Sequence, residues 1–90
     1  MTSTETVEIA FPCDYTFKAF CLVEIATEFN TLILQAVNTV LPCSADALRD
    51  RHSSTGRYSC VSVLVRLHNR QQLEAIYAQL RLIDGLVYLL

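Results

Sequence analysis

Alternation of hydrophobic and other residues predicts a long β-strand between residues 58 and 67. One face of this strand is wholly apolar and β-branched at three of its four positions: Val61, Val63, Val65 and Leu67. The opposite face is mixed and carries Tyr58, Cys60, Ser62, Leu64 and Arg66. A tight turn is predicted before the strand, because four turn formers stand there: Ser53, Ser54, Thr55 and Gly56. The long apolar face predicts a central position in a sheet.

A similar alternation predicts a first strand from Tyr15 onward. Its apolar face consists of Tyr15, Phe17, Ala19 and Cys21. Phe20 and Leu22 make its second face mixed as well, so we expect the two strands to be neighbours. The charged segment 45–51 is expected as an edge strand, since such charges prevent pairing with other chains. A last strand is predicted for the apolar run 86–90.

Two other segments have the spacing of amphipathic helices. Between residues 25 and 40 the apolar positions recur at i, i+4, i+7 and i+8, and Pro42 ends the pattern. Thr27 is an alternative cap, which would leave the residues before it in a loop. After the central strand, Asn69 and Gln72 have the form of a capping box and predict the start of a second helix.

The order strand, helix, strand, strand, helix, strand is the split βαβ pattern of ferredoxin-like domains. Right-handed crossovers in this pattern give a four-stranded antiparallel sheet with strand order 4-1-3-2. The predicted fold class is therefore α+β, a ferredoxin-like βαββαβ sandwich with two helices on one face of the sheet. The other face is expected to stay open.

Composition indicates one compact domain and argues against several function classes. A chain of 90 residues, 52% of them hydrophobic, supports a single core, which we place at residues 11–90 after a flexible N-terminal tail at residues 1–10. The net charge of −2 provides no long-range basic field for nucleic acid or anionic lipid. The N-terminus lacks signal-peptide features, no apolar run is long enough for a membrane span, and the four cysteines include no CxxC pair. We therefore expect a cytoplasmic protein with reduced thiols.

Three stretches carry a family resemblance that runs from about residue 11 to residue 90: FPCDYTFKAF at 11–20, SSTGRYSCVSV at 53–63 and IYAQLRLIDGLVYLL at 76–90. In this order and spacing they resemble the YbeD-like family of small uncharacterised bacterial proteins. The resemblance implies a ferredoxin-like fold similar to regulatory ACT domains, a small-molecule effector or a partner protein, and no enzymatic activity. That family tends to have glycine after the first strand, where this chain has Cys21. A side chain there counts against an ACT-type effector site.

Neither a metal site nor a catalytic set is evident in the sequence. Structural zinc ligands usually stand two to four residues apart, and the cysteines form no such pair. A cysteine nucleophile would need His52 or His68 beside a thiol, and the sequence places neither there. The chain also has no recognisable phosphate loop, carboxylate pair or Ser/His/Asp set. We therefore expect no cofactor, no metal and no enzyme activity.

The open sheet face is the first candidate binding surface. We expect a homodimer or another protein partner to bind there through Phe20, Leu22, Tyr58, Cys60 and Leu64. The last strand would add either Val87 and Leu89 or Leu86, Tyr88 and Leu90. The alternative is a modest patch covered by the N-terminal tail.

The turn before the central strand is the second candidate. A backbone nest surrounded by arginines can hold phosphate or a carboxylate, and this site would consist of Arg51, His52, Ser53, Ser54, Gly56 and Arg57. Asp46 and Asp50 partly cancel the charge, so a solvated hairpin tip is the alternative.

Nucleic acid is a further alternative on the open face, where Phe20 and Tyr58 could stack bases beside Lys18 and Arg66. GRYSCVSV lacks the aromatic pair of the RNA-recognition consensus, and the acidic total charge also argues against nucleic acid. The sequence thus predicts a non-catalytic regulatory or protein-interaction module. Small-anion or nucleic-acid binding, through the basic hairpin tip and the open face, is the alternative function.

Overall fold

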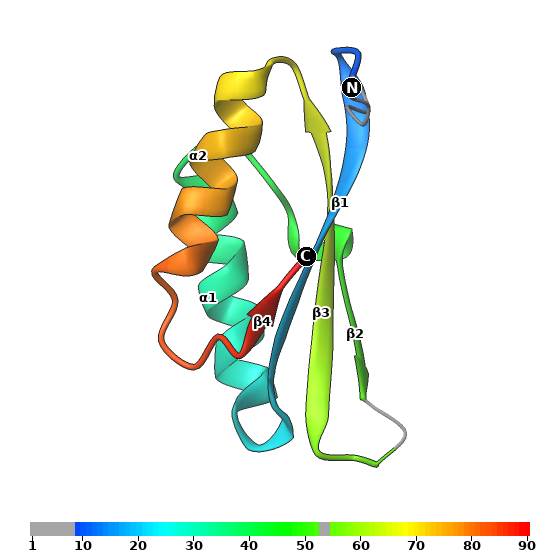
Figure 1. The fold of residues 1–90 in the computed structure, drawn as a ribbon, viewed down its shortest axis with the longest axis vertical. Coiled ribbons are helices and arrows are strands. Elements are labelled where there is room, and N and C mark those ends of the chain that lie inside the picture. The colour runs from blue at the N-terminus through cyan, green and yellow to red at the C-terminus, as the bar shows by residue number, and fades with distance from the viewer. Residues whose placement is uncertain (1–8, 53–54) are drawn as a thin grey trace, which may run out of the picture.

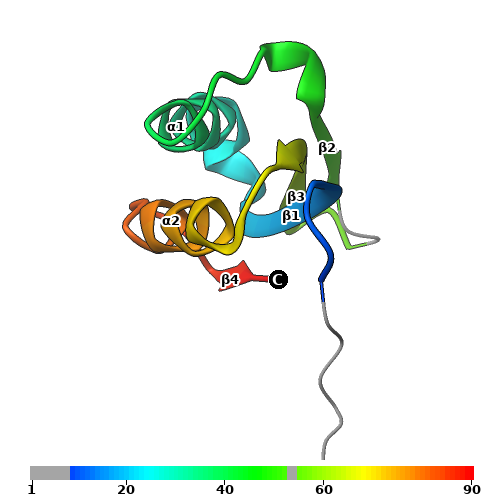
Figure 2. The ribbon, with the colours of Figure 1, turned by 90° about the horizontal axis from the view of Figure 1, so that it is seen from above.

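The computed structural model describes residues 9–52 and 55–90. A four-stranded antiparallel sheet, in the order β2-β3-β1-β4, has two helices packed side by side on one face (Figures 1 and 2). The strands are β1 (Cys13–Leu22), β2 (Leu48–His52), β3 (Tyr58–Leu67) and β4 (Tyr88–Leu89), and the helices are α1 (Ala26–Asn38) and α2 (Arg70–Arg81). Read from the opposite edge this order is 4-1-3-2, which confirms the predicted ferredoxin-like fold.

The two long strands β1 and β3 form the centre of the sheet. They pair along their whole length, from Cys13 opposite Leu67 to Leu22 opposite Tyr58, so the prediction that they are neighbours is confirmed. The predicted inward positions are buried against the helices: Phe17, Ala19, Cys21, Val61, Val63, Val65 and Leu67. Because side chains alternate strictly along a strand, this register directs the even-numbered residues of both strands to the open face.

Helix α1 covers the sheet with a stripe of buried residues that includes Phe29, Ile33 and Val37. A short 3₁₀ turn (Val23–Ile25) precedes it, and Ile25 occupies the N-cap position without a side-chain hydrogen bond. The alternative start at Thr27 is therefore wrong, because the backbone is already helical from Ala26. Burial of the apolar stripe, and not a polar cap, determines where this helix begins.

Helix α2 begins at the predicted capping box. The Gln72 backbone N–H donates to Asn69 Oδ1 at 2.9 Å, and the His68 backbone N–H donates to Gln72 Oε1 at 2.8 Å. Leu73, Ile76 and Leu80 are buried against the sheet. The helix therefore has both its predicted start and its predicted buried face.

An aromatic cluster joins α2 to β1. The Tyr15 and Tyr77 hydroxyl groups are hydrogen-bonded at 2.8 Å, and the ring centroids of Phe17 and Tyr77 are 4.9 Å apart in an edge-to-face arrangement. Burial raises the pKa of Tyr77 to about 12, and the hydrogen bond and charge interaction with Tyr15 add to this rise. Arg81 has the opposite effect on that pKa, and its guanidinium carbon lies 5.5 Å from the Tyr77 ring centroid.

Strand β4 is shorter than the predicted strand 86–90, although backbone hydrogen bonds to β1 continue on either side of it. Val87 N–H donates to Phe20 C=O at 2.8 Å, and Leu90 N–H donates to Lys18 C=O at 2.8 Å. The side chains match neither of the two predicted outward sets as a whole. Leu86 and Leu89 pack against the core, whereas Val87, Tyr88 and Leu90 are exposed.

The segment before β3 and the N-terminal region differ from the predictions in detail. Residues Ala45–Ala47 form a 3₁₀ turn, so only the second part of segment 45–51 belongs to the edge strand β2, which extends to His52. Ile9, which lies within the segment predicted as a loose tail, is partly buried against the core. Residues 1–8 lie outside the described part of the chain.

Candidate interaction surface

The open face of the sheet carries one continuous group of apolar side chains at the end nearest β4. Phe20 lies opposite Cys60 in the register of β1 and β3, and Leu22 lies opposite Tyr58. Tyr88 extends the group onto β4, with its ring centroid 5.9 Å from that of Phe20. We call this group the apolar patch; with the neighbouring C-terminal residue it comprises Phe20, Leu22, Tyr58, Cys60, Tyr88 and Leu90.

Leu64 shares the open face but not the apolar patch. The pair formed by Lys18 and Ser62 stands between Leu64 and the pair of Phe20 and Cys60. The structure thus places all five predicted interface residues on one face and separates one of them from the other four. This separation depends on the pairing register, which the two strand sequences do not reveal individually.

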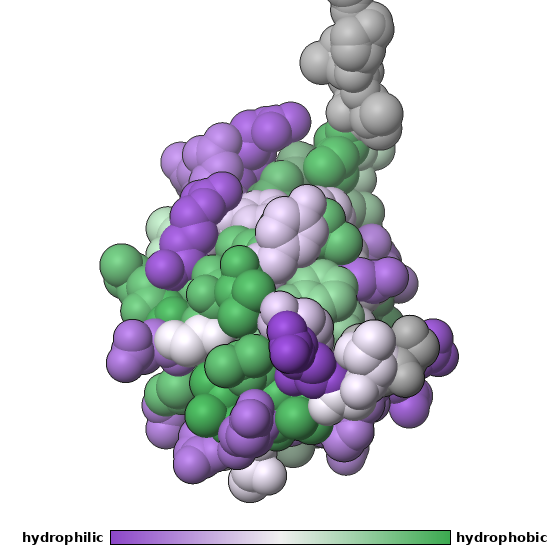
Figure 3. All heavy atoms as spheres, turned by 60° about the horizontal axis from the view of Figure 1, so that its bottom comes forward, coloured by the Kyte–Doolittle hydropathy of each residue, from purple (hydrophilic) through white to green (hydrophobic). Residues whose placement is uncertain are grey.

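The apolar patch is accessible to a partner. Tyr88 is 58% exposed and Leu90 is 51% exposed, values that are high for large hydrophobic side chains. Figure 3 shows hydrophobic side chains gathered at the end of the molecule that comes forward in that view, with hydrophilic ones around them. Val87 and Leu82 are also exposed, so the C-terminal segment adds further apolar surface.

Basic side chains occupy the other part of the open face, toward β2. In the sheet register Ser62 has Lys18 on one side and Arg49 on the other, and Arg51 lies opposite Cys60. These residues line a hollow of about 350 Å³. We call Lys18, Arg49 and Arg51 the cationic row.

The acidic groups nearest to the cationic row are oriented or paired elsewhere. Asp50 also borders the hollow, but its carboxylate lies on the helical side, where Asn30 Nδ2 donates to Asp50 Oδ2 at 3.2 Å. Asp14 forms an ion pair with Arg66, with Nη1 and Oδ1 3.3 Å apart. This part of the open face is therefore locally positive although the whole chain has a net charge of −2.

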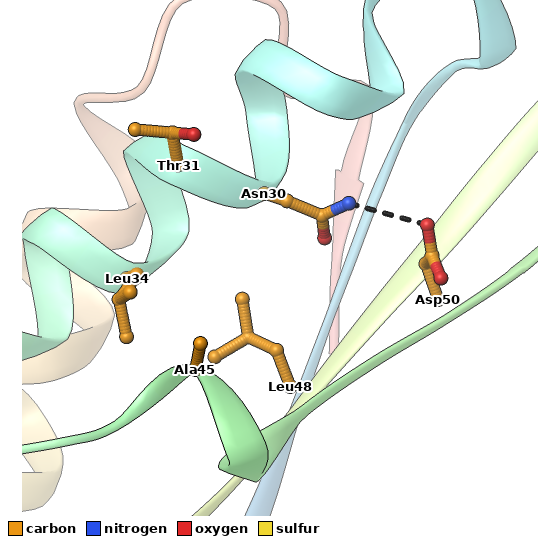
Figure 4. Close-up of a pocket in the computed structure, with 6 residues that line it drawn as sticks. All are labelled: Asn30, Thr31, Leu34, Ala45, Leu48 and Asp50. Atoms are coloured by element: carbon orange, nitrogen blue, oxygen red, sulfur yellow. Dashed lines mark hydrogen bonds between the residues drawn. The ribbon is translucent and has the colours of Figure 1, made fainter.

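A second hollow lies between α1 and β2, on the helical side of the sheet (Figure 4). Its volume is about 280 Å³, and we call it the α1–β2 groove. Leu34 and Leu48 form its apolar walls, and the hydrogen-bonded pair of Asn30 and Asp50 closes one end. Thr31 and Ala45 complete the lining.

Four of the six predicted anion-binding residues lie in the described part of the chain: Arg51, His52, Gly56 and Arg57. Arg51 and His52 border a hollow of about 140 Å³ on the open face, together with Phe20, Tyr58 and Cys60. Ser53 and Ser54 lie outside the described residues. Gly56 has the positive φ expected of a turn glycine, at +74°, and the backbone carbonyl of Arg57 accepts a hydrogen bond from Val23 N–H at 2.9 Å.

What sequence reasoning missed is the association of Arg49 with Lys18 and the groove beside β2. The alternation in LRDRH contains a partial signal, because it places Arg49 and Arg51 on the same face of a strand. Their position across β3 from Lys18 depends on the register of β2 with β3 and of β3 with β1.

The cysteines and histidines form no metal-binding cluster in the described part of the chain, where no three His, Cys, Asp or Glu side chains are close enough to hold an ion. All four cysteines are free. Burial raises the pKa of the Cys21 thiol, and the Asp50 carboxylate adds to the effect. Among the described residues, no helix is long and apolar enough to cross a membrane.

Together, the fold and these surfaces define a ferredoxin-like domain with helices on one face of its sheet and an apolar patch and a cationic row on the other. A family model described as a protein of unknown function, DUF493, matches residues 6–90. The chain is 35% identical over 83 residues to a UPF0250 protein of Neisseria gonorrhoeae, with 89% of each chain covered. It is 34% identical over 77 residues to a UPF0250 protein of Neisseria meningitidis serogroup C, with 84% of this chain and 82% of the relative covered. The chain therefore belongs to the DUF493/UPF0250 family, and the YbeD-like resemblance is confirmed.

A solved structure supports the fold. The solution structure of protein HP0495 from H. pylori is similar, with a TM-score of 0.69 over 97% of this chain and 90% of that one. Its sequence identity is 16%, so this likeness concerns the fold alone.

Proposed function

We propose that this protein is a non-catalytic interaction module that binds a protein partner through the open face of its sheet. The observation that carries this proposal is the apolar patch, in which residues of β1, β3 and β4 meet on the face that the helices leave uncovered. Burying a Phe or Leu side chain contributes roughly 1.5 to 3 kcal/mol, so a few such residues can offset much of the entropy lost on association. Either a second copy of the chain or a different protein can supply the complementary surface.

A regulatory role is part of this proposal and is supported by the likeness of the fold to ACT domains. Cys21, the residue that departs from the family pattern, is fully buried in the core opposite Ser59. Its side chain therefore occupies space between the sheet and the helices. This placement favours regulation by a partner protein over an ACT-type effector site that needs backbone access at this position.

The first test measures self-association. Sedimentation velocity at micromolar concentration compares the parent with a Phe20→Gln/Leu64→Gln double variant and with a Leu32→Gln/Leu82→Gln control, whose changes remove exposed leucines outside the sheet. A dimer that dissociates only in the Phe20/Leu64 variant supports a second copy as the partner. Amide spectra with added inorganic phosphate test the alternative, since small-anion binding predicts shifts at Arg51 and Arg57.

If the parent is a monomer, the same proteins serve as matched baits for affinity capture from cells that produce the chain. A specific partner should be captured by the parent and the control and be lost from the Phe20/Leu64 variant. A partner that binds all three baits equally, or a folded parent that captures nothing, contradicts the proposed use of the open face.

A further inference from the structure

We propose that the free edge of β2 adds a strand from a partner protein, and that this strand carries acidic side chains toward the open face. The inference goes beyond the proposed function, because the contact lies at the sheet edge beside the α1–β2 groove and not on the apolar patch. It follows from the backbone pattern of β2, from the charges on its two faces and from the shape of the groove.

The backbone of β2 has a free edge. Strand β2 pairs with β3 on one side, and no strand of the described chain pairs with the other side. The backbone N–H and C=O groups of Lys18 both bond to Leu90, on the β4 side of β1. Because the direction of these groups alternates along an antiparallel ladder, the odd-numbered residues of β1 direct their N–H and C=O groups toward β3. Because β1 pairs with β3, and β3 with β2, without interruption, the same alternation extends to β2. Leu48, Asp50 and His52 consequently direct their backbone N–H and C=O groups outward, where an added strand can pair with them.

The two faces of β2 specify the chemistry of such a strand. Arg49 and Arg51 lie on the open face, and opposite charges on adjacent strands stabilise pairing. Leu48 lies on the helical side in the α1–β2 groove (Figure 4). Because side chains of a strand alternate between faces, the complementary segment carries carboxylates toward the arginines and apolar side chains toward the groove. Beside Asp50, a neutral residue or a hydrogen-bond donor fits.

The same charges disfavour a second copy of this chain at the edge. In a two-fold symmetric antiparallel pair, the residues opposite each other lie on the same face of the extended sheet. Every register that pairs at least three residues of β2 with their copies then places arginine opposite arginine: Arg49 with Arg49, Arg49 with Arg51, or Arg51 with Arg51. Like charges directly opposite are destabilising. The edge of β2 therefore disfavours pairing with a second copy of the chain and favours a strand of opposite charge.

The groove and the free backbone groups also favour a polypeptide over a nucleic acid. Main-chain N–H and C=O groups satisfy the edge in the ladder pattern, which a sugar–phosphate backbone cannot reproduce. The apolar wall of Leu34 and Leu48 gives a phosphate no partner.

The test uses an acetylated and amidated peptide of alternating Glu and Val, about seven residues long, which is a usual strand length. Amide spectra of the full-length protein should shift at Leu48, Asp50 and His52 as this peptide is added. A peptide with Gln in place of Glu tests the charges, and a peptide with Pro in place of the central Val tests the ladder. Both control peptides should bind more weakly.

Two matched variants locate the charge contact. Arg49→Gln/Arg51→Gln should raise the dissociation constant of the acidic peptide roughly fivefold, as expected for two exposed cross-strand charge pairs. Arg70→Gln/Arg81→Gln, which removes two charges from α2, should leave the constant unchanged apart from a small general effect of net charge.

Several results would overturn the inference: no shift at β2, equal binding of the Gln or Pro peptide, or stronger β2 shifts with a single-stranded oligonucleotide. Concentration-dependent shifts at β2 without peptide would identify a second copy as the occupant and also contradict it. The Phe20→Gln/Leu64→Gln variant should still bind the peptide. If the parent does not bind the peptide, while the Phe20→Gln/Leu64→Gln variant loses the protein partner that the parent captures, the edge inference is refuted and the proposed function stands.

Discussion

Ser62 and Val63 are adjacent on β3 but point to opposite faces, so the same change at each position tests the sheet orientation directly. Val63 is only 1% exposed and packs between the sheet and the helices. Ser62 lies on the open face between Lys18 and Arg49. We expect Val63→Asp to unfold the domain and Ser62→Asp to leave it folded.

The expected losses in the free energy of unfolding differ clearly between the two variants. At position 63 a carboxylate must either stay charged in the core or bind a proton at neutral pH. Because the group can bind a proton once its pKa rises to neutrality, the ionisation cost at pH 7 is limited to about 4 kcal/mol, from roughly three pH units above the ordinary Asp pKa at about 1.4 kcal/mol per unit. The lost burial of Val63 adds roughly 1.5 to 3 kcal/mol. A domain of this size has a free energy of unfolding of about 5 to 13 kcal/mol. The Val63→Asp variant should therefore retain little or no stability.

At position 62 the new carboxylate gains two opposite charges across the strands. Each such pair contributes about 0.2 to 1 kcal/mol, and the low strand propensity of Asp costs about as much. Ser62→Asp should therefore unfold within about 1 kcal/mol of the parent, and its stability should fall when salt screens the pairs. Ser62→Asn is the uncharged control.

The assay is urea unfolding followed by circular dichroism at neutral pH, for the parent and the three variants. The reasoning is refuted if Val63→Asp and Ser62→Asp have the same midpoint, or if the Ser62 variant is the less stable one. A Ser62→Asp midpoint that does not respond to salt would remove the charge contribution while leaving the orientation of β3 intact.

Two other predictions concern the packing around α2. Because the pKa of Tyr77 rises from 10 to about 12 on folding, the unfolded chain releases this proton first, and the stability of the parent should fall as pH increases from 10 to about 12. In urea titrations, the free energy of unfolding of the Tyr77→Phe variant should fall less over that pH range than that of the parent. An equal fall would contradict the assignment of this pH dependence to Tyr77. Gly85→Ala should lower the melting temperature more than Gly56→Ala, although both glycines have positive φ. An added Cβ at Gly85 would lie 2.5 Å from Ile25 Cδ1, whereas at Gly56 no atom of the described residues lies within 4 Å. The conformational cost common to both is about 1 kcal/mol, so equal melting temperatures would mean that Ile25 moves aside freely.

The local sequence determined the central elements of this fold. The alternation in β1 and β3 identified their buried faces, and the capping box identified the start of α2, where the Gln72 N–H bonds Asn69 Oδ1. These features follow from periods of two and 3.6 residues and from contacts within one turn, so neighbouring residues suffice to encode them. The family resemblance strengthened the order of elements but added no geometry.

Only the tertiary structure decided how those elements form the candidate surfaces. The separation of Leu64 from the apolar patch and the grouping of Lys18 with Arg49 both depend on the pairing register between strands. The α1–β2 groove requires Leu34 and Leu48 to face one space, although a helix end and a loop stand between them in the chain. A local pattern fixes which face a side chain occupies. Its neighbours across the sheet are fixed by packing between distant segments, which no single stretch of sequence contains.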